Sequence, residues 1–284
     1  MPHFQFFALI LSHQSKTAAM IKVLGIPFDA NSSFLKGPAL APPRIRLMEK
    51  EGSANTSSEN GSDIIEGIVY KDFGDISFPN PNPEEAFKKI KSTVADLIGD
   101  GSKLLSFGGD HSVSFPVIDA FSEKYEQLNI LHLDAHGDLY DNFDDNPFSH
   151  ASPFARIMEK GKIKSLTQVG IRTLNANQRK QAEKFGVKMI ETKNFNLGFI
   201  SQLKSPLYIS LDLDVLDPAF APGLSHHEPG GLSTRQLIEI IQNVPAKIVG
   251  ADIVEYNPVR DVHNMTAMVA YKMFKEIIAK MIAD

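Results

Sequence analysis

Short apolar segments alternate along this chain with segments that carry apolar residues at helical spacing. In residues 84–98, for example, Ala86, Ile90, Val94 and Leu97 are spaced as on one face of an amphipathic helix. Because strands and helices alternate, the pattern predicts an α/β fold with a mainly parallel sheet and helices on both of its faces. Strands are predicted over residues 21–28, 102–107, 128–133, 166–171, 206–213 and 246–254. Helices are predicted over residues 84–98, 113–125, 150–160, 175–185, 233–244 and 265–282.

Length and loop composition favour a single domain. A chain of 284 residues is within reach of one α/β domain. Residues 49–63 are polar and rich in glycine and serine, so we expect a surface loop there and not a linker between domains. Residues 20–284 are therefore predicted to form one domain, preceded by a flexible N-terminal extension over residues 1–19.

Composition excludes several classes of function. The formal net charge of −5, without a dense block of lysine and arginine, gives nucleic acid little to bind. The chain has no cysteine, which excludes disulfides, zinc–thiolate sites and thiol catalysis and fits a reducing compartment. We therefore expect a cytoplasmic protein without membrane attachment. The apolar stretch at 4–11 resembles a signal-peptide core but follows no lysine or arginine, and it leaves an organellar or exported form open.

Acidic and histidine side chains gather at the ends of four predicted strands. Ligands of open parallel sheets bind beyond the carboxyl ends of the strands, so these four ends are predicted to converge on one crevice. Charges crowded in this way repel one another, which predicts that something positive lies among them. The residues are Asp110 and His111 in the first group, His132, Asp134, His136 and Asp138 in the second, Asp212, Asp214 and Asp217 in the third, and Asp252 and Glu255 in the fourth.

The predicted crevice has the donors of a metal centre. Side chains alternate along a strand, so Asp134, His136 and Asp138 are expected to point one way, and so are Asp212 and Asp214. Four carboxylates without a counter-charge would take up protons. Two divalent cations balance them, and oxygen and nitrogen donors without sulfur favour manganese, with zinc, iron, cobalt and nickel left open.

Three motifs in this order resemble the metal motifs of the ureohydrolases, the arginase and agmatinase family. They are GGDHS at 108–112, DAHGD at 134–138 and SLDLDVLDP at 210–218. Segments such as FSHASPFARIME, DPAFAPGLSH and EPGGLS resemble the plant-type arginase branch in particular, within a resemblance that runs from about Gly25 to the C-terminus. The resemblance implies a three-layer α/β/α sandwich, two Mn²⁺ ions per subunit and a homotrimer or homohexamer.

The resemblance also implies a ligand set and roles for the residues around it. One ion would be held by His111, Asp134, Asp138 and Asp212, and the other by Asp134, His136, Asp212 and Asp214. Asp138 would also orient the attacking water, and Glu255 would pair with the planar cation of the substrate. His150 would bind near the substrate and protonate the departing amine, and His226 would lie near the guanidinium. His227 is expected at the surface and Asp217 in a turn or behind the ligands.

The activity that the resemblance implies is hydrolysis of a guanidino compound with release of urea. L-Arginine, which gives L-ornithine, is the first expectation, and agmatine, which gives putrescine, is the second. Formiminoglutamate, guanidinobutyrate and guanidine are further candidates. Tyr140 stands where animal and bacterial arginases have an asparagine, which keeps agmatine in consideration. A metal-dependent deacetylase and a non-catalytic homologue are the alternatives from other classes.

Overall fold

The structure is a computed structural model that describes residues 20–79 and 82–283, so the expected extension over residues 1–19 lies outside the described part. Eight strands of the described residues form one sheet in the order β2-β1-β3-β8-β7-β4-β5-β6. All neighbouring pairs are parallel, which confirms the predicted sheet. The strands are β1 (Ile21–Gly25), β2 (Tyr70–Asp75), β3 (Leu104–Phe107), β4 (Leu128–Leu133), β5 (Ile163–Ile171), β6 (Lys188–Glu191), β7 (Leu207–Asp212) and β8 (Ile248–Val254).

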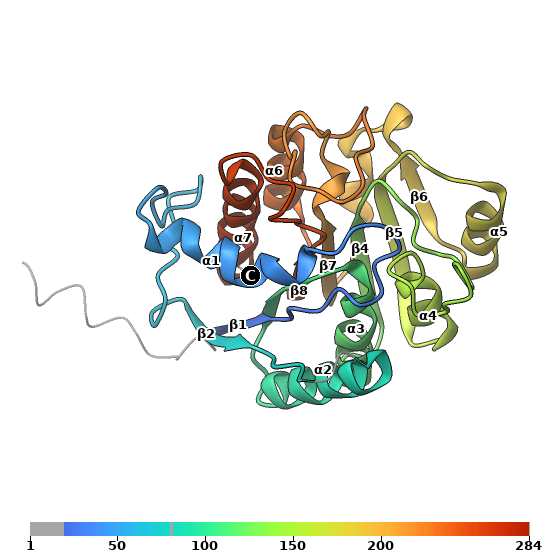
Figure 1. Cartoon of the computed structure of the whole chain (residues 1–284), viewed down its shortest axis with the longest axis horizontal. Helices are drawn as coiled ribbons and strands as arrows, with labels where there is room; N and C mark the ends of the chain where they lie inside the picture. Colours follow the sequence, from blue (N-terminus) through green and yellow to red (C-terminus); the bar gives the residue numbers. More distant parts are fainter. Residues whose placement is uncertain (1–19, 80–81, 284) are drawn as a thin grey trace, which may run out of the picture.

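Helices cover both faces of the sheet (Figure 1). One hydrophobic core joins the sheet to α1, α6 and α7, and a second joins the other face to α2, α3, α4 and α5. The fold is therefore the three-layer α/β/α sandwich that the sequence resemblance implied. The helices are α1 (Ala41–Lys50), α2 (Pro83–Ile98), α3 (Ser114–Lys124), α4 (Pro153–Glu159), α5 (Ala176–Phe185), α6 (Thr234–Asn243) and α7 (Met265–Ala283).

The central strands are mainly apolar because both of their faces are buried. In β4, Ile130 packs in the core with α2 and α3, whereas Leu131 and Leu133 pack in the core with α6 and α7. Alternate side chains of a strand point to opposite faces, so a strand between two helical layers needs an apolar residue at almost every position. This is why the sequence pattern found β1, β3, β4, β5, β7 and β8.

The pattern did not predict β2, β6 or α1. Strands β2 and β6 form the two edges of the sheet, and most of their side chains are partly or fully exposed. An edge strand therefore lacks the apolar run that marks a central strand. Helix α1 starts with Pro42 and Pro43, which are tolerated in the first turn of a helix because the backbone N–H groups there have no intrahelical partner.

The polar segment 49–63 begins in the last turn of α1, and its residues 51–63 form a surface loop, as predicted. It is fixed over the α6–α7 layer by Glu59, whose carboxylate pairs with Arg235 at 2.7 Å. The backbone N–H of Glu59 also donates to the carboxylate of Glu276 on α7 at 2.8 Å. Within the described residues, no helix is both long enough and apolar enough to span a bilayer.

Candidate metal centre and active site

The strand order brings the four acidic strand ends together. Strands β3, β8, β7 and β4 are consecutive neighbours in the sheet, and all of them run parallel. Their carboxyl ends therefore lie side by side, although the segments are separated by as many as 144 residues along the chain. The predicted convergence on one crevice is confirmed.

Tight turns, and not strand alternation, hold the acidic side chains. Strand β4 ends at Leu133, so Asp134 and His136 lie beyond it, and the prediction that pleating aligns them is wrong. Asp134 instead accepts a hydrogen bond from the backbone N–H of His136. Asp212 likewise accepts from the N–H of Asp214 at 2.8 Å, and Asp214 accepts from the N–H of Ala135 at 2.9 Å. These bonds fix the carboxylates before any ion binds.

His111 faces three carboxylates. Its Nδ1 atom lies 3.1 Å from Asp134 Oδ2, 3.0 Å from Asp138 Oδ2 and 3.2 Å from Asp212 Oδ2. This Nδ1 atom is buried and has no hydrogen-bond partner of normal geometry among the described residues. A buried nitrogen without a hydrogen bond, surrounded by carboxylate oxygens, is the arrangement that a bound cation would complete.

A second group of donors shares Asp134 with the first. His136 Nδ1 lies 2.9 Å from Asp214 Oδ2 and 3.3 Å from Asp134 Oδ1. The tightest sets of donor atoms are His111, His132, Asp134 and Asp138 on one side and Asp134, His136 and Asp214 on the other, each within 4.8 Å. The structure thus brings all six predicted ligands together. It leaves Asp212 just outside the tightest sets and adds His132, which the ligand set implied by the sequence did not contain.

The charges of this cluster are strongly coupled. Burial and repulsion from Asp214 and Asp134 raise the pKa of Asp212 well above its usual range, and burial together with Asp134 also raises the pKa of Asp214. Burial acts in the same direction on Asp134, but its histidine neighbours lower the pKa of this carboxyl well below its usual value. Carboxylates that resist ionisation without a counter-charge fit a site for cations.

The other ring nitrogen of His111 is held from behind. Its Nε2 atom lies 3.1 Å from Ser210 Oγ, and Ser210 donates to Asp252 Oδ1 at 2.7 Å. Asp252 is fully buried and also accepts a hydrogen bond from Tyr208 at 2.8 Å. Asp252 therefore supports His111, a candidate ligand, through Ser210 and does not itself line the crevice. Such outer partners fix the tautomer and the ring orientation of a metal-binding histidine.

Two other acidic residues from the strand-end motifs stabilise turns of the backbone. Asp110 is the N-cap of the short turn that carries His111, because its side chain accepts from the N–H of Ser112 at 3.1 Å. Asp217 accepts hydrogen bonds from the N–H groups of Ala219 at 3.0 Å and Gly230 at 2.7 Å. The turn expected at Asp217 is confirmed.

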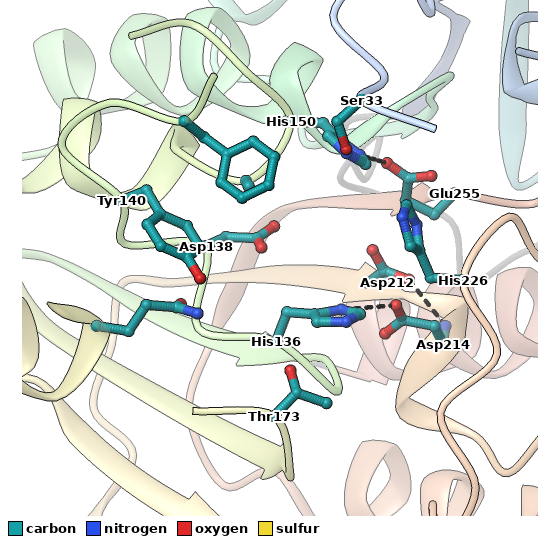
Figure 2. A pocket seen from close by; sticks show the side chains of 13 residues that line it. Ser33, His136, Asp138, Tyr140, His150, Thr173, Asp212, Asp214, His226 and Glu255 are labelled. Atoms are coloured by element: carbon teal, nitrogen blue, oxygen red, sulfur yellow. Dashed lines mark hydrogen bonds and ion pairs between the residues drawn. The ribbon is translucent and has the colours of Figure 1, made fainter. Parts of the chain in front are cut away.

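Glu255, His150 and Ser33 form a row on one side of the crevice (Figure 2). Glu255 Oε1 accepts from the backbone N–H of His111 and lies 2.8 Å from both that nitrogen and His150 Nδ1. His150 Nε2 in turn lies 2.8 Å from Ser33 Oγ. Burial disfavours the charged imidazole, but the Glu255 carboxylate outweighs this effect and raises the pKa of His150 to about 9. His150 is therefore a cation at neutral pH, with a proton on each nitrogen.

These side chains line a cavity of about 160 Å³. Figure 2 shows Glu255, His150 and His226 on one side of it and Tyr140 and Thr173 on the other. The cavity is small beside pockets for drug-sized ligands, which have roughly 300 Å³ or more. Its lining consists of Ser33, His136, Asp138, Tyr140, Phe143, His150, Ala151, Thr173, Gln178, Asp212, Asp214, His226 and Glu255.

Both predicted substrate-side histidines lie at this cavity. The ring of His226 is 5.4 Å from that of His150 and 5.9 Å from that of His136. Burial and the nearby His150 cation lower the pKa of His226, so this ring is neutral beside a charged one. His227 is exposed and contacts the carbonyl of Pro222 at 2.9 Å, which confirms its expected surface position.

Three polar residues of the lining were not predicted from the sequence. Ser33, Thr173 and Gln178 carry no charge and stand in no motif that indicates a metal or a catalyst, so no local signal distinguished them. Phe143 also lines the cavity. Phe148 contributes instead to a larger cavity of about 480 Å³ between α2, α3 and α4, away from the cluster.

Two candidate site residues have a left-handed backbone. Asp138 has φ 48° and Glu255 has φ 63°, a conformation that costs a non-glycine residue roughly 1–3 kcal/mol. Each backbone conformation is held by a hydrogen bond. The carbonyl of Asp138 accepts from the N–H of Phe154, and the N–H of Glu255 donates to the carbonyl of Gly109. These hydrogen bonds fix the backbone from which both carboxylates project into the cavity.

Known proteins with similar sequences include arginases and agmatinases. Arginase 1, mitochondrial, of Arabidopsis thaliana is 46% identical over 277 residues, which cover 92% of this chain and 81% of that protein. An agmatinase of Bacillus anthracis is 31% identical over 95% of this chain and 94% of its own length. The solved structure of an arginase from Medicago truncatula superposes with a TM-score of 0.87 at 42% identity and covers 93% of this chain and 88% of that one.

The expected cytoplasmic location is contradicted by these relatives. The Arabidopsis arginase is named mitochondrial, and a second arginase of that plant, also 46% identical, is named chloroplastic/mitochondrial. Absence of cysteine was a weak basis for the expectation, because a protein without thiols is compatible with any redox environment.

A family model described as the arginase family matches residues 19–279. The match spans all eight strands and every residue of the metal cluster and of the cavity described above. The fold, the order of the motifs and the geometry of the crevice agree with it. The chain belongs to the arginase family.

Proposed function

We propose that this chain is a binuclear manganese hydrolase that converts L-arginine and water to L-ornithine and urea. The observation that carries the proposal is the pair of donor groups that share Asp134, with Glu255 facing the same cavity. The 46% identity to a plant arginase, against 31% to an agmatinase, favours arginine over agmatine. Agmatine is the second candidate because Tyr140 lines the cavity where animal and bacterial arginases have an asparagine.

The donor set fits two Mn²⁺ ions. It consists of carboxylate oxygens and imidazole nitrogens, and the chain has no sulfur ligand from cysteine to favour softer metals. His111, Asp134, Asp138 and Asp212 would hold one ion, and His136 and Asp214 would hold the other together with Asp134 and Asp212. The ions, when bound, would act as Lewis acids and lower the pKa of the water that attacks the substrate.

Glu255 would bind and orient the guanidinium. Its Oε1 atom is fixed by His111 N and His150, so the carboxylate plane is set before substrate enters. A planar carboxylate pairs well with a planar fork of N–H donors, which places the guanidino carbon for attack. Asp138 would accept a hydrogen bond from the attacking water and aim it at that carbon.

His150 would supply the proton for the departing amine. Water adds to the guanidino carbon, and the bond between this carbon and the side-chain nitrogen then breaks. The nitrogen leaves as an amine and needs a proton. The charged His150 ring lies at the cavity between Glu255 and Ser33 and has an acidic N–H on each side.

Polar groups on the opposite wall would bind the rest of the substrate. The described residues that line the cavity include neither lysine nor arginine. A carboxylate at the far end of the substrate would therefore be bound by hydroxyl and amide groups, such as those of Thr173 and Gln178, without a lysine or arginine partner.

A side-by-side substrate assay tests the proposal. Purified protein loaded with Mn²⁺ is assayed for urea from L-arginine, agmatine, guanidinobutyrate and guanidine, and its metal content is measured in the same sample. We expect two Mn²⁺ per chain and the highest kcat/KM with L-arginine. A higher kcat/KM with agmatine would refute the substrate, and absence of urea from all four would refute the hydrolase.

A matched pair of variants tests the cavity. His226→Asn should lower kcat/KM because His226 borders the place of the guanidinium. His227→Asn should leave kcat/KM unchanged because His227 is exposed. Equal effects of the two changes would contradict the assigned geometry. We also propose a homotrimer or homohexamer, which light scattering of the purified protein checks directly.

A further inference from the structure

His132 lies behind the metal centre and has no part in the mechanism above. Its side chain is 0% exposed, and its ring stacks on Phe154 with 3.8 Å between the ring centroids. Its Nε2 atom lies 2.7 Å from Asp134 Oδ2, the carboxylate that both donor groups share. A histidine in this position is either a further metal ligand or a support for Asp134, and the two roles need different protonation of Nε2.

Gln168, on β5, decides between them. Its Nε2 atom lies 2.6 Å from the carbonyl oxygen of Gly137 and 2.9 Å from His132 Nδ1. A carbonyl oxygen can only accept a hydrogen bond, so the NH₂ end of the Gln168 amide must face Gly137. Rotating the amide by half a turn would place two oxygens against each other at that short distance.

The same NH₂ group therefore also donates to His132. An imidazole nitrogen that accepts a hydrogen bond carries no proton, so His132 Nδ1 is the unprotonated nitrogen. The proton of the neutral ring is then on Nε2, from which it is donated to Asp134 Oδ2. A protonated Nε2 has no free lone pair and cannot bind a metal ion.

We propose that His132 is a positioning residue for the metal centre, fixed by Gln168 in its Nε2-protonated form, and that it orients the carboxylate of Asp134, which belongs to both donor groups. The proposal rests on the proposed function for the presence of the two ions. Asp134 Oδ1 is fixed by the N–H of His136, and His132 fixes Oδ2, so both oxygens are oriented. Gln168 also fixes the turn 134–138 through Gly137.

Two substitutions at His132 separate the hydrogen bond from packing. His132→Phe keeps an aromatic ring on Phe154 but removes the donor, and we expect Mn²⁺ affinity to fall about 10- to 100-fold, as for other outer partners of metal ligands. His132→Gln places an amide N–H near the position of Nε2 and should restore most of that affinity. Phe154→Leu is the matched control, because it removes the stacking and leaves the hydrogen bond.

The measurement is calorimetric titration of metal-depleted protein with Mn²⁺, supported by ¹⁵N NMR of histidine-labelled protein. The NMR spectrum of the wild type should show His132 in the Nε2-protonated form. Gln168→Met removes the donor to Nδ1 and leaves the hydrogen bond from Nε2 to Asp134, so the ¹⁵N resonance of the unprotonated Nδ1 should move to the position of a nitrogen without a hydrogen bond. This readout remains if His132→Phe does not fold, and a role of His132 in packing alone would leave the resonance unchanged.

Four results would overturn the proposal: Nδ1-protonated His132 in the wild type, an unchanged Nδ1 resonance in Gln168→Met, wild-type Mn²⁺ affinity in a folded His132→Phe, or His132→Gln that binds Mn²⁺ as weakly as His132→Phe. Wild-type protein that binds two Mn²⁺ but releases no urea would refute the proposed function instead. The metal and tautomer measurements would then still support the role of His132.

Discussion

The ion pair between His150 and Glu255 should make the stability of the metal-depleted protein depend on pH. A pKa of about 9 in place of the ordinary 6.5 corresponds to roughly 3 kcal/mol of net stabilisation of the charged imidazole in the folded state. His150 is only 8% exposed, so solvent screens this interaction little. The perturbation that tests it is Glu255→Gln, which keeps the shape and hydrogen-bonding capacity of the side chain but removes its charge.

The sign follows from which state binds the proton more tightly. Below pH 6.5 both the folded and the unfolded chain hold the proton, and the stabilisation is fully present. Between pH 6.5 and 9 the unfolded chain loses its proton first, so the free energy of unfolding falls as pH rises. Without the Glu255 carboxylate, burial disfavours the charged ring, and the contribution of His150 to this loss of stability should disappear. The contributions of His111 and His136, whose pKa values are raised by other carboxylates, should remain.

Urea denaturation of metal-depleted wild type and Glu255→Gln at pH 6, 7, 8 and 9 measures the effect, with NMR titration of His150 as a direct check. The wild type should lose roughly 3 kcal/mol more than the variant over this range. The reasoning would be refuted if the free energy of unfolding had the same slope against pH in both proteins, or if His150 titrated near 6.5 in the wild type.

Three further changes test other parts of the site. Asp134→Asn should abolish binding of both ions and lower the melting temperature, and retention of one full equivalent of Mn²⁺ would contradict a shared ligand. Chelation should destabilise the wild type by about 3 kcal/mol for each ion removed if Mn²⁺ was held at 100 times its Kd, and an unchanged Tm would contradict it. Gly109→Ala should destabilise the fold and weaken Mn²⁺ binding, because its Cβ would overlap the backbone of Phe28. The Cβ of Gly99→Ala would approach no atom closer than 3.3 Å, so its effect should be much smaller, and calorimetry that shows equal effects would refute this.

The sequence by itself determined the central strands of the sheet and the kinds of residue in the metal centre. Buried central strands need apolar residues on both faces, and this leaves continuous runs such as 128–133 that are readable without a structure. The ligands stand directly after such runs, so the parallel arrangement alone places them at one edge of the sheet. That 20–284 forms one domain stays a prediction, which the single sheet supports.

The tertiary structure decided what depends on contacts between distant segments. Edge strands β2 and β6 escape pattern analysis because one side of each pairs with no strand of the described sheet and their side chains are largely exposed. Ser33 meets His150 across 117 residues, and Gln168 meets His132 across 36. Sequence periodicity records whether a position is buried, but it does not record which polar partner completes a buried hydrogen bond. The fixed direction of each catalytic and ligating group is therefore a property of the folded chain.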